Sequence, residues 1–446
     1  MAELLSVGLD VGTTTSQMIL SRLTVENKAS AFAVPQMQIC ARKILYRSPV
    51  VFTPLLDKDH VDGIKLRQWV AEQYRQAGIE PGQVDTGAII ITGETSRKEN
   101  AKAVLEALSS FAGDFVVTTA GPHLESVLAA KGAGAVQYSE NTGKTVLHMD
   151  IGGGTANLAW ILQGKVVKTG CLNVGGRLLK LDEQGVVTYV SPVLSGLSVL
   201  QVGDKPSLTQ LEEVTGKLVR ALEMAAGLTQ PTDLLDRLWT QEAGAAWENR
   251  EVADVISFSG GVADCVEKEY PPFAFGDIGP VLGKAIRESR LCSGNYRLGE
   301  ETIRATVIGA GCHSTQLSGS TVFYQNIRFP LKNLPVVSWD GQEKPVFGDA
   351  NAGVLAMKGL ADPDYQSIKE LAGQIARCNI APVIVAVEQD MAKALGHALS
   401  LCLPEETPIL CIDRVQLGED SYLDIGAPVG PCLPVVVKTL VLATKQ

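Results

Sequence analysis

Short apolar segments alternate with segments of helical periodicity along almost the whole chain. The expected strands are residues 4–9, 17–23, 88–92, 114–118, 146–149, 157–162, 255–258, 382–387, 408–412 and 435–442. The expected helices are residues 100–111, a helix that begins at Pro122, a long helix after Ser207, and residues 305–317 and 391–401. Strands that alternate with helices are typical of layered domains. The sequence therefore predicts an α/β fold.

The helix after Ser207 has the clearest periodic pattern. Its apolar positions are Leu211, Val214, Leu218, Leu222 and Ala225. This spacing places them on one face of the helix, which we expect to pack against a sheet. Thr209 and Glu212 form a capping-box pattern, so we expect the helix to begin at Thr209.

The length of the chain indicates more than one domain, because 446 residues exceed what one hydrophobic core holds. The two glycines of Gly132-Ala133-Gly134 give the backbone conformational freedom, so we predict a hinge there. We predict a first domain over residues 1–135, a second over 136–319 and a C-terminal α/β region over 320–446. The third region has no recognisable catalytic loop.

Two segments share the pattern of strand, aspartate, small-residue turn and returning strand. Their residues are Asp10 with Gly12, Thr13, Thr14 and Thr15, and Asp150 with Gly152, Gly153, Gly154 and Thr155. The copies are in phase, since 150 − 10 and 155 − 15 are both 140. Glycines let the turn fold tightly with its N–H groups outward, where phosphate oxygens accept from them. Each aspartate would face a hydrated Mg²⁺ ion that neutralises the phosphates.

Two further copies of Asp-Ile-Gly, at 277–279 and 424–426, provide an internal comparison. Pro280 follows the first copy directly, and Pro428 follows the second after one residue. Proline has no N–H to donate, and neither copy leads into a threonine and a returning strand. An ordinary hairpin turn is the alternative for each phosphate loop, but two in-phase copies favour phosphate binding.

A third motif is the strand at 255–258, which ends in Ser259-Gly260-Gly261 and leads into a helix. Gly260 and Gly261 have no side chains, so a flat adenine ring could lie against their backbone beside the helix N-terminus. A plain strand-to-helix turn is the alternative interpretation. The position of the motif after the two loops favours nucleotide binding.

These motifs in this order resemble the actin-like ATPase superfamily, which includes sugar kinases and the heat-shock chaperone ATPase. The resemblance matches residues 10–15 and 150–155 to the two phosphate loops and 259–263 to the adenosine motif. It matches 122–134, with Glu125, and 305–315 to the two connecting helices. It implies two ribonuclease-H-like domains with a nucleotide in the cleft between them.

Other stretches resemble one family in that superfamily, the ethanolamine ammonia-lyase reactivating factors. They are the chain start and residues 91–100, 148–157, 423–430 and 434–441. The resemblance implies rescue of an adenosylcobalamin enzyme, driven by ATP with Mg²⁺. The factor binds the inactivated lyase and loosens its cofactor site, so that damaged cobalamin leaves and intact adenosylcobalamin binds. A related factor has a small partner subunit, of which this chain gives no sign; a homodimer is left open.

We assign roles to the candidate residues on this basis. Asp10 and Asp150 position Mg²⁺ and water, and one of them polarises the attacking water. Glu94 and Glu125 are supporting carboxylates, with an unrelated exposed charge as the alternative for each. The sequence identifies no lysine for the γ-phosphate, which argues for slow turnover.

Composition limits the partners and the compartment. The net charge is −10 without a basic patch, which argues against nucleic acid and anionic lipid. The chain start predicts a strand and not a signal peptide, and no apolar run approaches the about 20 residues of a membrane span. The nine cysteines are scattered and never spaced as C-x-x-C, so we expect buried thiols, among them Cys402 and Cys411 as small apolar residues. We expect a cytoplasmic protein and leave association with a bacterial microcompartment open.

Weaker candidates and two rival functions complete the picture. Asp57, Asp59 and Asp62 are spaced as in a calcium loop, but Gln68 occupies position 12, so we expect a solvated acidic loop. His123 and His148 have no partners at metal spacing, and we expect core or surface roles for them. A small-molecule kinase on the same fold would need a general base near a polar pocket. A non-catalytic nucleotide-binding scaffold is the other rival, whereas an iron–sulfur activator would need paired cysteines.

Overall fold

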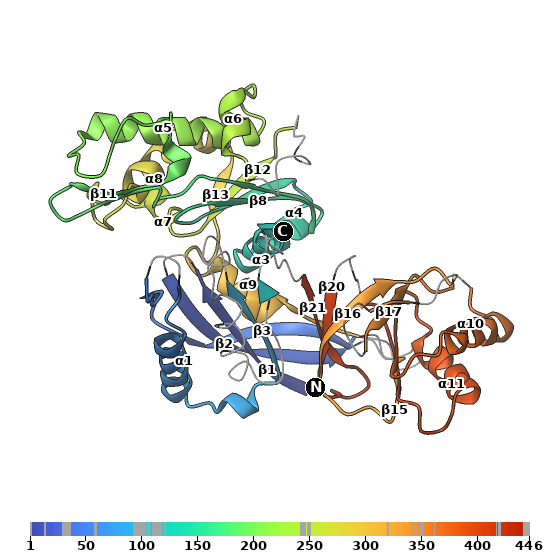
Figure 1. Cartoon of the computed structure of the whole chain (residues 1–446). Helices are drawn as coiled ribbons and strands as arrows, with labels where there is room; N and C mark the ends of the chain where they lie inside the picture. Colours follow the sequence, from blue (N-terminus) through green and yellow to red (C-terminus); the bar gives the residue numbers. More distant parts are fainter. Residues whose placement is uncertain are drawn as a thin grey trace.

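The computed structural model of the chain contains two sheets around a pair of helices, with a third sheet beside the first (Figure 1). The structure describes residues 2–12, 15–28, 37–57, 60–91, 104, 108, 118–119, 122–240, 247, 251–318, 321–341, 345–347, 352–360, 362–415, 417 and 421–439.

The first sheet is formed by the N-terminal strands. They are β1 (Ala2–Val11), β2 (Thr15–Asn27), β3 (Met37–Arg47), β4 (Val51–Phe52), β5 (Thr86–Ile91) and β6 (Thr118–Thr119). Their order is β3-β2-β1-β5-β6, with β4 on β2. Strands β1, β2 and β3 are antiparallel neighbours, whereas β5 is parallel to β1 and β6 to β5. Helix α1 (Gly63–Ala77) and the short η1 (Pro81–Gln83) connect β4 to β5.

The second sheet repeats this arrangement. Its strands are β7 (Val146–Ile151), β8 (Ala156–Leu162), β9 (Lys165–Leu172), β12 (Val255–Ser259) and β13 (Tyr296–Leu298), in the order β13-β12-β7-β8-β9. Antiparallel pairs again join the first three strands, and β12 and β13 are again parallel additions. Both sheets thus have the strand order of a ribonuclease-H-like domain. The prediction of a duplicated α/β fold of this kind is confirmed.

Two helices lie between the sheets (Figure 1). Helix α3 (Pro122–Gly132) contacts β7, β8 and β9 of the second sheet, and α9 (Ala305–His313) contacts β1, β2 and β5 of the first. The helices also pack against each other, because a side chain at Gly132 or Gly309 would meet the backbone of the other helix. Helix α4 (Ala135–Thr142) follows α3 after Gly134. The φ of 74° at Gly134 interrupts the helix, so the chain changes direction between α3 and α4.

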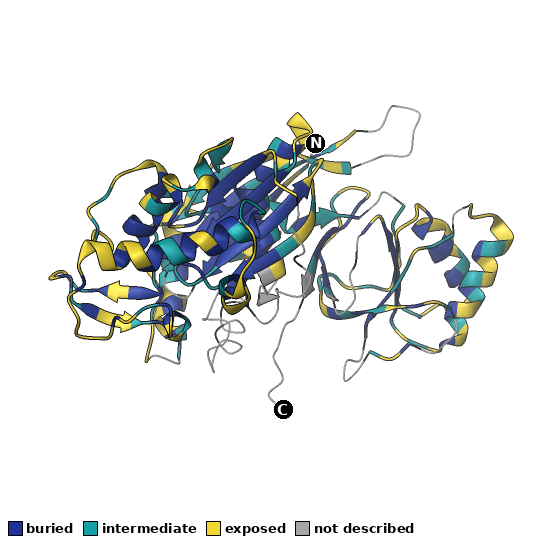
Figure 2. Cartoon of the chain, turned by 90° about the horizontal axis from the view of Figure 1, so that it is seen from above, coloured by how far each residue is buried: buried dark blue, intermediate teal, exposed yellow. Residues whose placement is uncertain are grey.

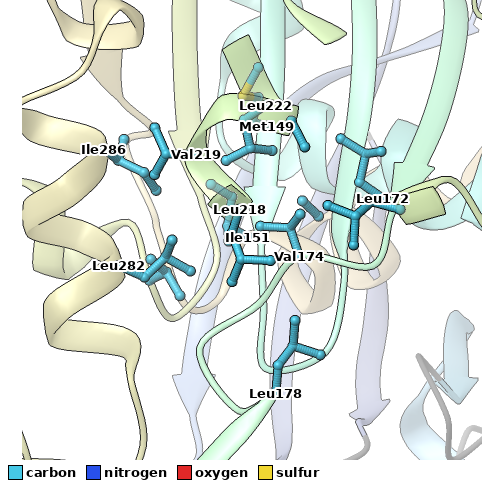
Figure 3. Close-up of a cluster of buried hydrophobic side chains, with 14 of the residues drawn as sticks. Met149, Ile151, Leu172, Val174, Leu178, Leu218, Val219, Leu222, Leu282 and Ile286 are labelled. Atoms are coloured by element: carbon cyan, nitrogen blue, oxygen red, sulfur yellow. The ribbon is translucent and has the colours of Figure 1, made fainter. Parts of the chain in front are cut away.

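Helices α5 and α8 cover the outer face of the second sheet. The additional elements of this part are β10 (Leu179–Leu181), β11 (Val187–Val190), η3 (Pro192–Leu194), α5 (Leu208–Ala225), α6 (Asp233–Leu238), α7 (Asp264–Glu267), α8 (Gly279–Arg287) and η4 (Arg290–Cys292). Figure 3 shows how Met149 and Ile151 of β7 face Leu218 and Leu222 of α5. Burying such side chains supplies about 1.5–3 kcal/mol each, so this core fixes the second phosphate loop to a rigid base.

The third sheet contains the C-terminal strands. They are β14 (Thr315–Leu317), β15 (Phe323–Gln325), β16 (Leu331–Ser338), β17 (Val354–Met357), β18 (Val383–Val387), β19 (Ile409–Asp413), β20 (Ser421–Ile425) and β21 (Pro434–Thr439). The order is β14-β21-β20-β16-β17-β18-β19-β15, with β16 to β19 parallel. Helices α10 (Tyr365–Arg377) and α11 (Ala392–Cys402) pack on β17 to β19. Strand β14 follows α9 closely, and the Thr315 and Thr86 hydroxyls lie 2.8 Å apart, which ties this sheet to the first.

Burial follows the layers. Figure 2 shows buried strands at the centre of the sheets and helices with exposed outer faces. Most cysteines are buried thiols as expected, and all nine are free, but Cys402 is exposed and the packing role predicted for it is wrong. No helix in the described ranges is long and apolar enough to cross a membrane.

Three local predictions need correction. The long helix α5 begins after Ser207, and its capping box pairs Ser207 with Gln210, so the prediction of Thr209 and Glu212 is wrong. Helix α9 ends at His313, and residues 315–317 form a strand because β21 offers them a pairing edge. Asp62 is not part of a solvated loop: it is buried, and its side chain caps α1 by accepting from the Lys65 N–H at 3.0 Å. The expected elements at 100–111 and 114–117 lie almost wholly outside the described residues.

Candidate functional site

The two predicted phosphate loops have the same local geometry. In the first, the Gly12 N–H donates to the Thr15 carbonyl at 2.9 Å, and in the second the Gly152 N–H donates to the Thr155 carbonyl at 2.9 Å. Each bond closes a tight turn between an inner strand and its antiparallel neighbour. Thr13 and Thr14 lie outside the described residues. The in-phase repeat seen in the sequence is therefore also a repeat of structure.

A segment from elsewhere in the chain hydrogen-bonds to a carbonyl group of each loop. We call these two segments, at Thr53 and at Arg177, the cover segments. The Thr53 hydroxyl donates to the Gly12 carbonyl at 2.7 Å, and the Arg177 N–H donates to the Gly153 carbonyl at 2.6 Å. Within the described ranges the N–H groups of Gly153 and Gly154 have no acceptor, and both residues are partly exposed. Partly exposed N–H groups on a glycine turn are suited to an anion.

Asp10 and Asp150 occupy equivalent places, each one residue before the end of its strand, and each is 8% exposed. Burial raises the pKa of the Asp150 carboxyl to about 6, and hydrogen bonds from Ser259 and Thr306 partly offset that rise. Ser259 donates to Oδ1, and the Thr306 hydroxyl lies 3.4 Å from Oδ2. The second aspartate is thus held by two donors from distant parts of the chain.

The cross-strand partners of the aspartates are amides. Gln17 lies opposite Asp10, and its Nε2 donates to the Ile303 carbonyl at 2.8 Å. Asn157 lies opposite Asp150, and its Nδ2 donates to Glu125 Oε2 at 2.9 Å. The side-chain oxygen of each amide, Oε1 of Gln17 and Oδ1 of Asn157, is buried and has no partner among the described residues. Both halves therefore place an unsatisfied acceptor next to the aspartate.

This set of oxygens fits a hydrated Mg²⁺ ion. The carboxylates of Asp10, Asp150 and Glu125 and the two orphaned amide oxygens are hard donors, and water on the ion would satisfy such buried acceptors. Among the residues that the structure describes, no three Cys, His, Asp or Glu side chains come close enough to bind a metal by themselves.

The Gly-Gly motif lies directly against the second phosphate loop. Gly260 has φ 87°, and a side chain there would collide with the backbone of Ile151. The Val262 N–H donates to the Ile151 carbonyl at 3.1 Å, which joins the two loops. Gly261 is exposed, and a Cβ there would meet nothing within 4 Å. Close backbone packing explains Gly260, whereas Gly261 leaves an open face of the kind predicted for a base.

One segment, residues 300–306, connects the parts of the site. Its contacts are the Gly260 N–H with the Thr302 carbonyl at 3.1 Å, Gln17 with Ile303, Arg304 with the Ser48 carbonyl at 3.0 Å, and Thr306 with Asp150. Glu301 also pairs with Arg47 at 2.7 Å. The segment leads into α9 and includes its first residues, so any movement of that helix reaches both phosphate loops.

Sequence reasoning missed Arg177 and Phe52. Arg177 Nε pairs with Asp277 Oδ2 at 3.0 Å, and its guanidinium carbon lies 5.5 Å from the centre of the Phe52 ring. Phe52 adjoins Thr53, which covers the first loop, so this pair links the two cover segments. Burial raises the pKa of Asp277, while the Gly279 N–H and Arg177 act in the opposite direction. The Asp-Ile-Gly copy at 277–279 thus starts α8 and supports the second loop.

The remaining candidates separate clearly. Glu125 is buried on α3 beside the second loop, whereas Glu94 lies outside the described residues. His123 is exposed, with Nδ1 2.7 Å from the Thr169 hydroxyl, and His148 is fully buried. The Asp57 carboxylate lies 2.9 Å from His60 Nδ1, and Asp59 is outside the described residues.

Comparison with known proteins extends this picture. Residues 2–443 match the model of the family described as "Ethanolamine utilisation protein EutA". The chain is 40% identical over 476 residues to the ethanolamine ammonia-lyase reactivase of Salmonella typhimurium, and 41% identical over 466 residues to that of Escherichia coli; each match covers 98% of both chains. A crystal structure of the Ppx/GppA family member of Aquifex aeolicus is similar with a TM-score of 0.43 and 13% identity, over 69% of this chain and 97% of that one. A similarity that low carries no functional argument.

Proposed function

Because the chain belongs to the family of ethanolamine utilisation proteins called EutA, we propose that it is an ATP-dependent reactivating factor for ethanolamine ammonia-lyase. Two curated relatives with that activity in their names match it from end to end. Its task is to release damaged cobalamin from the lyase, so that intact adenosylcobalamin binds in its place.

The observation that supports nucleotide binding is the matched geometry of the two loops. The N–H groups of Gly153 and Gly154 would donate to the β- and γ-phosphates, and the first loop, closed by the same kind of bond, would lie on the other side of them. Gly261 and Gly260 form the adenosine side of the site. The backbone of Arg177 is bonded to Gly153, and its guanidinium, paired with Asp277, is the cation that we assign to the phosphates.

Mg²⁺ supplies charge neutralisation to the phosphates when it is bound. Asp10 and Asp150 would hold the ion, and the amide oxygens of Gln17 and Asn157 would be acceptors for water bound to it. Glu125 orients Asn157 through the 2.9 Å hydrogen bond from Nδ2. We expect slow turnover, because the sequence identifies no lysine for the γ-phosphate.

The 300–306 segment couples the nucleotide to the rest of the molecule. A ligand shifts a conformational equilibrium only by its difference in affinity for the two states. A coupling of about 2 kcal/mol between the ATP and ADP states suffices for a tens-fold change in affinity for the lyase. The contacts of Gln17 with Ile303 and of Thr306 with Asp150 are those that such a change would alter, because they join different sheets to one segment.

Reactivation of inactivated lyase tests this function. Purified protein is mixed with the inactivated lyase, free adenosylcobalamin, ATP and Mg²⁺, and ammonia release is followed. We expect recovery with the parent chain and none with Asp150→Asn, which removes the charge and keeps the shape. The matched control is Asp424→Asn, since Asp424 is also a buried aspartate in an Asp-Ile-Gly tripeptide but lies in β20. No recovery with the parent chain, or full recovery with Asp150→Asn, would contradict the proposal.

A further inference from the structure

A row of buried polar side chains crosses the interior of the second sheet and ends on Asp150. His148 Nδ1 lies 3.1 Å from the Ser257 hydroxyl, and His148 Nε2 lies 2.9 Å from the Ser259 hydroxyl. Ser259 in turn donates to Asp150 Oδ1. His148, Ser257 and Ser259 have no exposed surface. Buried polar groups of this kind are costly unless every hydrogen bond is satisfied.

The chemistry of the groups gives the row one direction. Ionised Asp150 can only accept, so Ser259 spends its single hydroxyl proton on that bond. Ser259 must then accept from His148 Nε2, which therefore carries the ring proton. Nδ1 of the neutral ring is left as an acceptor for the Ser257 hydroxyl. The donors thus run from Ser257 through His148 and Ser259 to Asp150.

The ring is neutral, as this order of donors requires. A neutral imidazole has one donor and one acceptor nitrogen, which matches its two serine partners. Each nitrogen thus has a single partner and a single role.

The first sheet provides an internal comparison. There the register places Gly8 opposite Ala88 and Asp10 opposite Ile90, where the second sheet pairs His148 with Ser257 and Asp150 with Ser259. Side chains that correspond to the row are therefore absent from the first sheet. The fold does not need the row, since the same topology forms around apolar residues. Its presence beside only one aspartate indicates a task specific to Asp150.

We propose that His148 is a positioning residue that acts through Ser259 to hold the Asp150 carboxylate toward the nucleotide. The proposal rests on the function proposed above. Ser259 directly precedes Gly260, so the same bond fixes the phosphate-side aspartate to the adenosine motif. His148 Nε2 donates its proton to a lone pair of the Ser259 hydroxyl oxygen. The hydroxyl proton of Ser259 therefore points toward Asp150.

The tautomer of His148 tests the row without nucleotide or metal. The chain contains five histidines, so selective ¹⁵N-histidine labelling gives a small set of imidazole signals, and His148→Gln identifies the one that belongs to His148. At pH 8 we expect the proton on Nε2. A proton on Nδ1 would overturn the proposal, because Nε2 would then accept from the Ser259 hydroxyl, which could no longer donate to Asp150.

Two variants test the positioning role. The amide nitrogen of glutamine reaches the place of Nε2, whereas that of asparagine reaches only the place of Nδ1. We expect His148→Gln to keep kcat for ATP hydrolysis within about threefold of the parent and His148→Asn to lower it about tenfold or more, with KM for ATP nearly unchanged, as for a lost bond to a charged acceptor. Equal loss in both variants, with equal urea midpoints, would indicate a structural role and overturn the proposal. Absence of hydrolysis by the parent chain would instead contradict the proposed function, and the tautomer measurement would still decide the direction of the row.

Discussion

The crossing of α3 and α9 allows a prediction that follows directly from distances. A methyl group on Gly309 would lie 2.6 Å from the carbonyl carbon of Leu128 and 2.8 Å from its Cα. Carbon atoms pack at about 3.5 Å or more, so the helices would have to separate by about 1 Å in Gly309→Ala. The obstacle is backbone, and it cannot be relieved by rotation of a side chain.

The cost of such overpacking is about 1–3 kcal/mol. The same displacement would affect the site, because α3 carries Glu125, which accepts from Asn157 beside the second loop, and α9 carries Thr306, which contacts Asp150. We therefore expect Gly309→Ala to unfold at lower urea concentration than the parent and to reactivate the lyase more slowly.

Gly216→Ala is the matched control. Gly216 lies within α5, and a methyl group there would meet nothing within 4 Å. Alanine in place of glycine stabilises a helix by about 1 kcal/mol, so the same chemical change should raise the urea midpoint here. Both variants are compared by circular dichroism during urea unfolding and by the ammonia assay. A midpoint for Gly309→Ala at or above that of the parent would refute the inference that α3 and α9 require glycine at their crossing.

Two further predictions concern the site. Phe52→Ala removes the ring under Arg177, and we expect the affinity for ATP, measured by calorimetry, to fall less than about fivefold. Arg177→Ala should lower that affinity about tenfold or more. An Arg177→Ala variant that binds ATP as tightly as the parent would contradict the role of that cation. The second prediction concerns pH. Because burial raises the pKa of Asp150 to about 6, the native state binds this proton more tightly than the unfolded chain. The protonated carboxyl therefore contributes roughly 3 kcal/mol of stability below about pH 4, and this contribution is lost as pH rises through 6. Without nucleotide and metal, urea midpoints of the parent should fall relative to Asp150→Asn between pH 5 and 7, and parallel curves would contradict this.

The assignments that sequence reasoning made correctly concern local structure. Each phosphate loop is a turn between neighbouring antiparallel strands, and its closing hydrogen bond spans three residues, so the pattern of aspartate, glycine and threonine contains the whole geometry. Helix periodicity was equally informative for α5, although the pattern placed the N-cap at Thr209, two positions after the observed N-cap Ser207, because two adjacent capping boxes compete in the sequence.

The contacts that complete the site come from distant parts of the chain. Ser259 is 109 residues from Asp150, Thr306 is 156 residues from it, and Asp277 is 100 residues from Arg177. No spacing rule relates such positions, since their approach depends on how the sheets and connecting helices pack. His148 illustrates this point: alone it had only a core or surface role, and its hydrogen-bonding role became visible once β12 lay beside β7.

The sequence alone thus determined the α/β class, the paired loops and the family. These depend on periodicity, short turns and motifs, all of which are formed by residues close together in the sequence. Only the tertiary structure decided which donors hold Asp150, which segments bond to the loop carbonyls and how one segment reaches both halves. Those features depend on packing between elements, where the free energy of burial selects neighbours that local sequence does not encode.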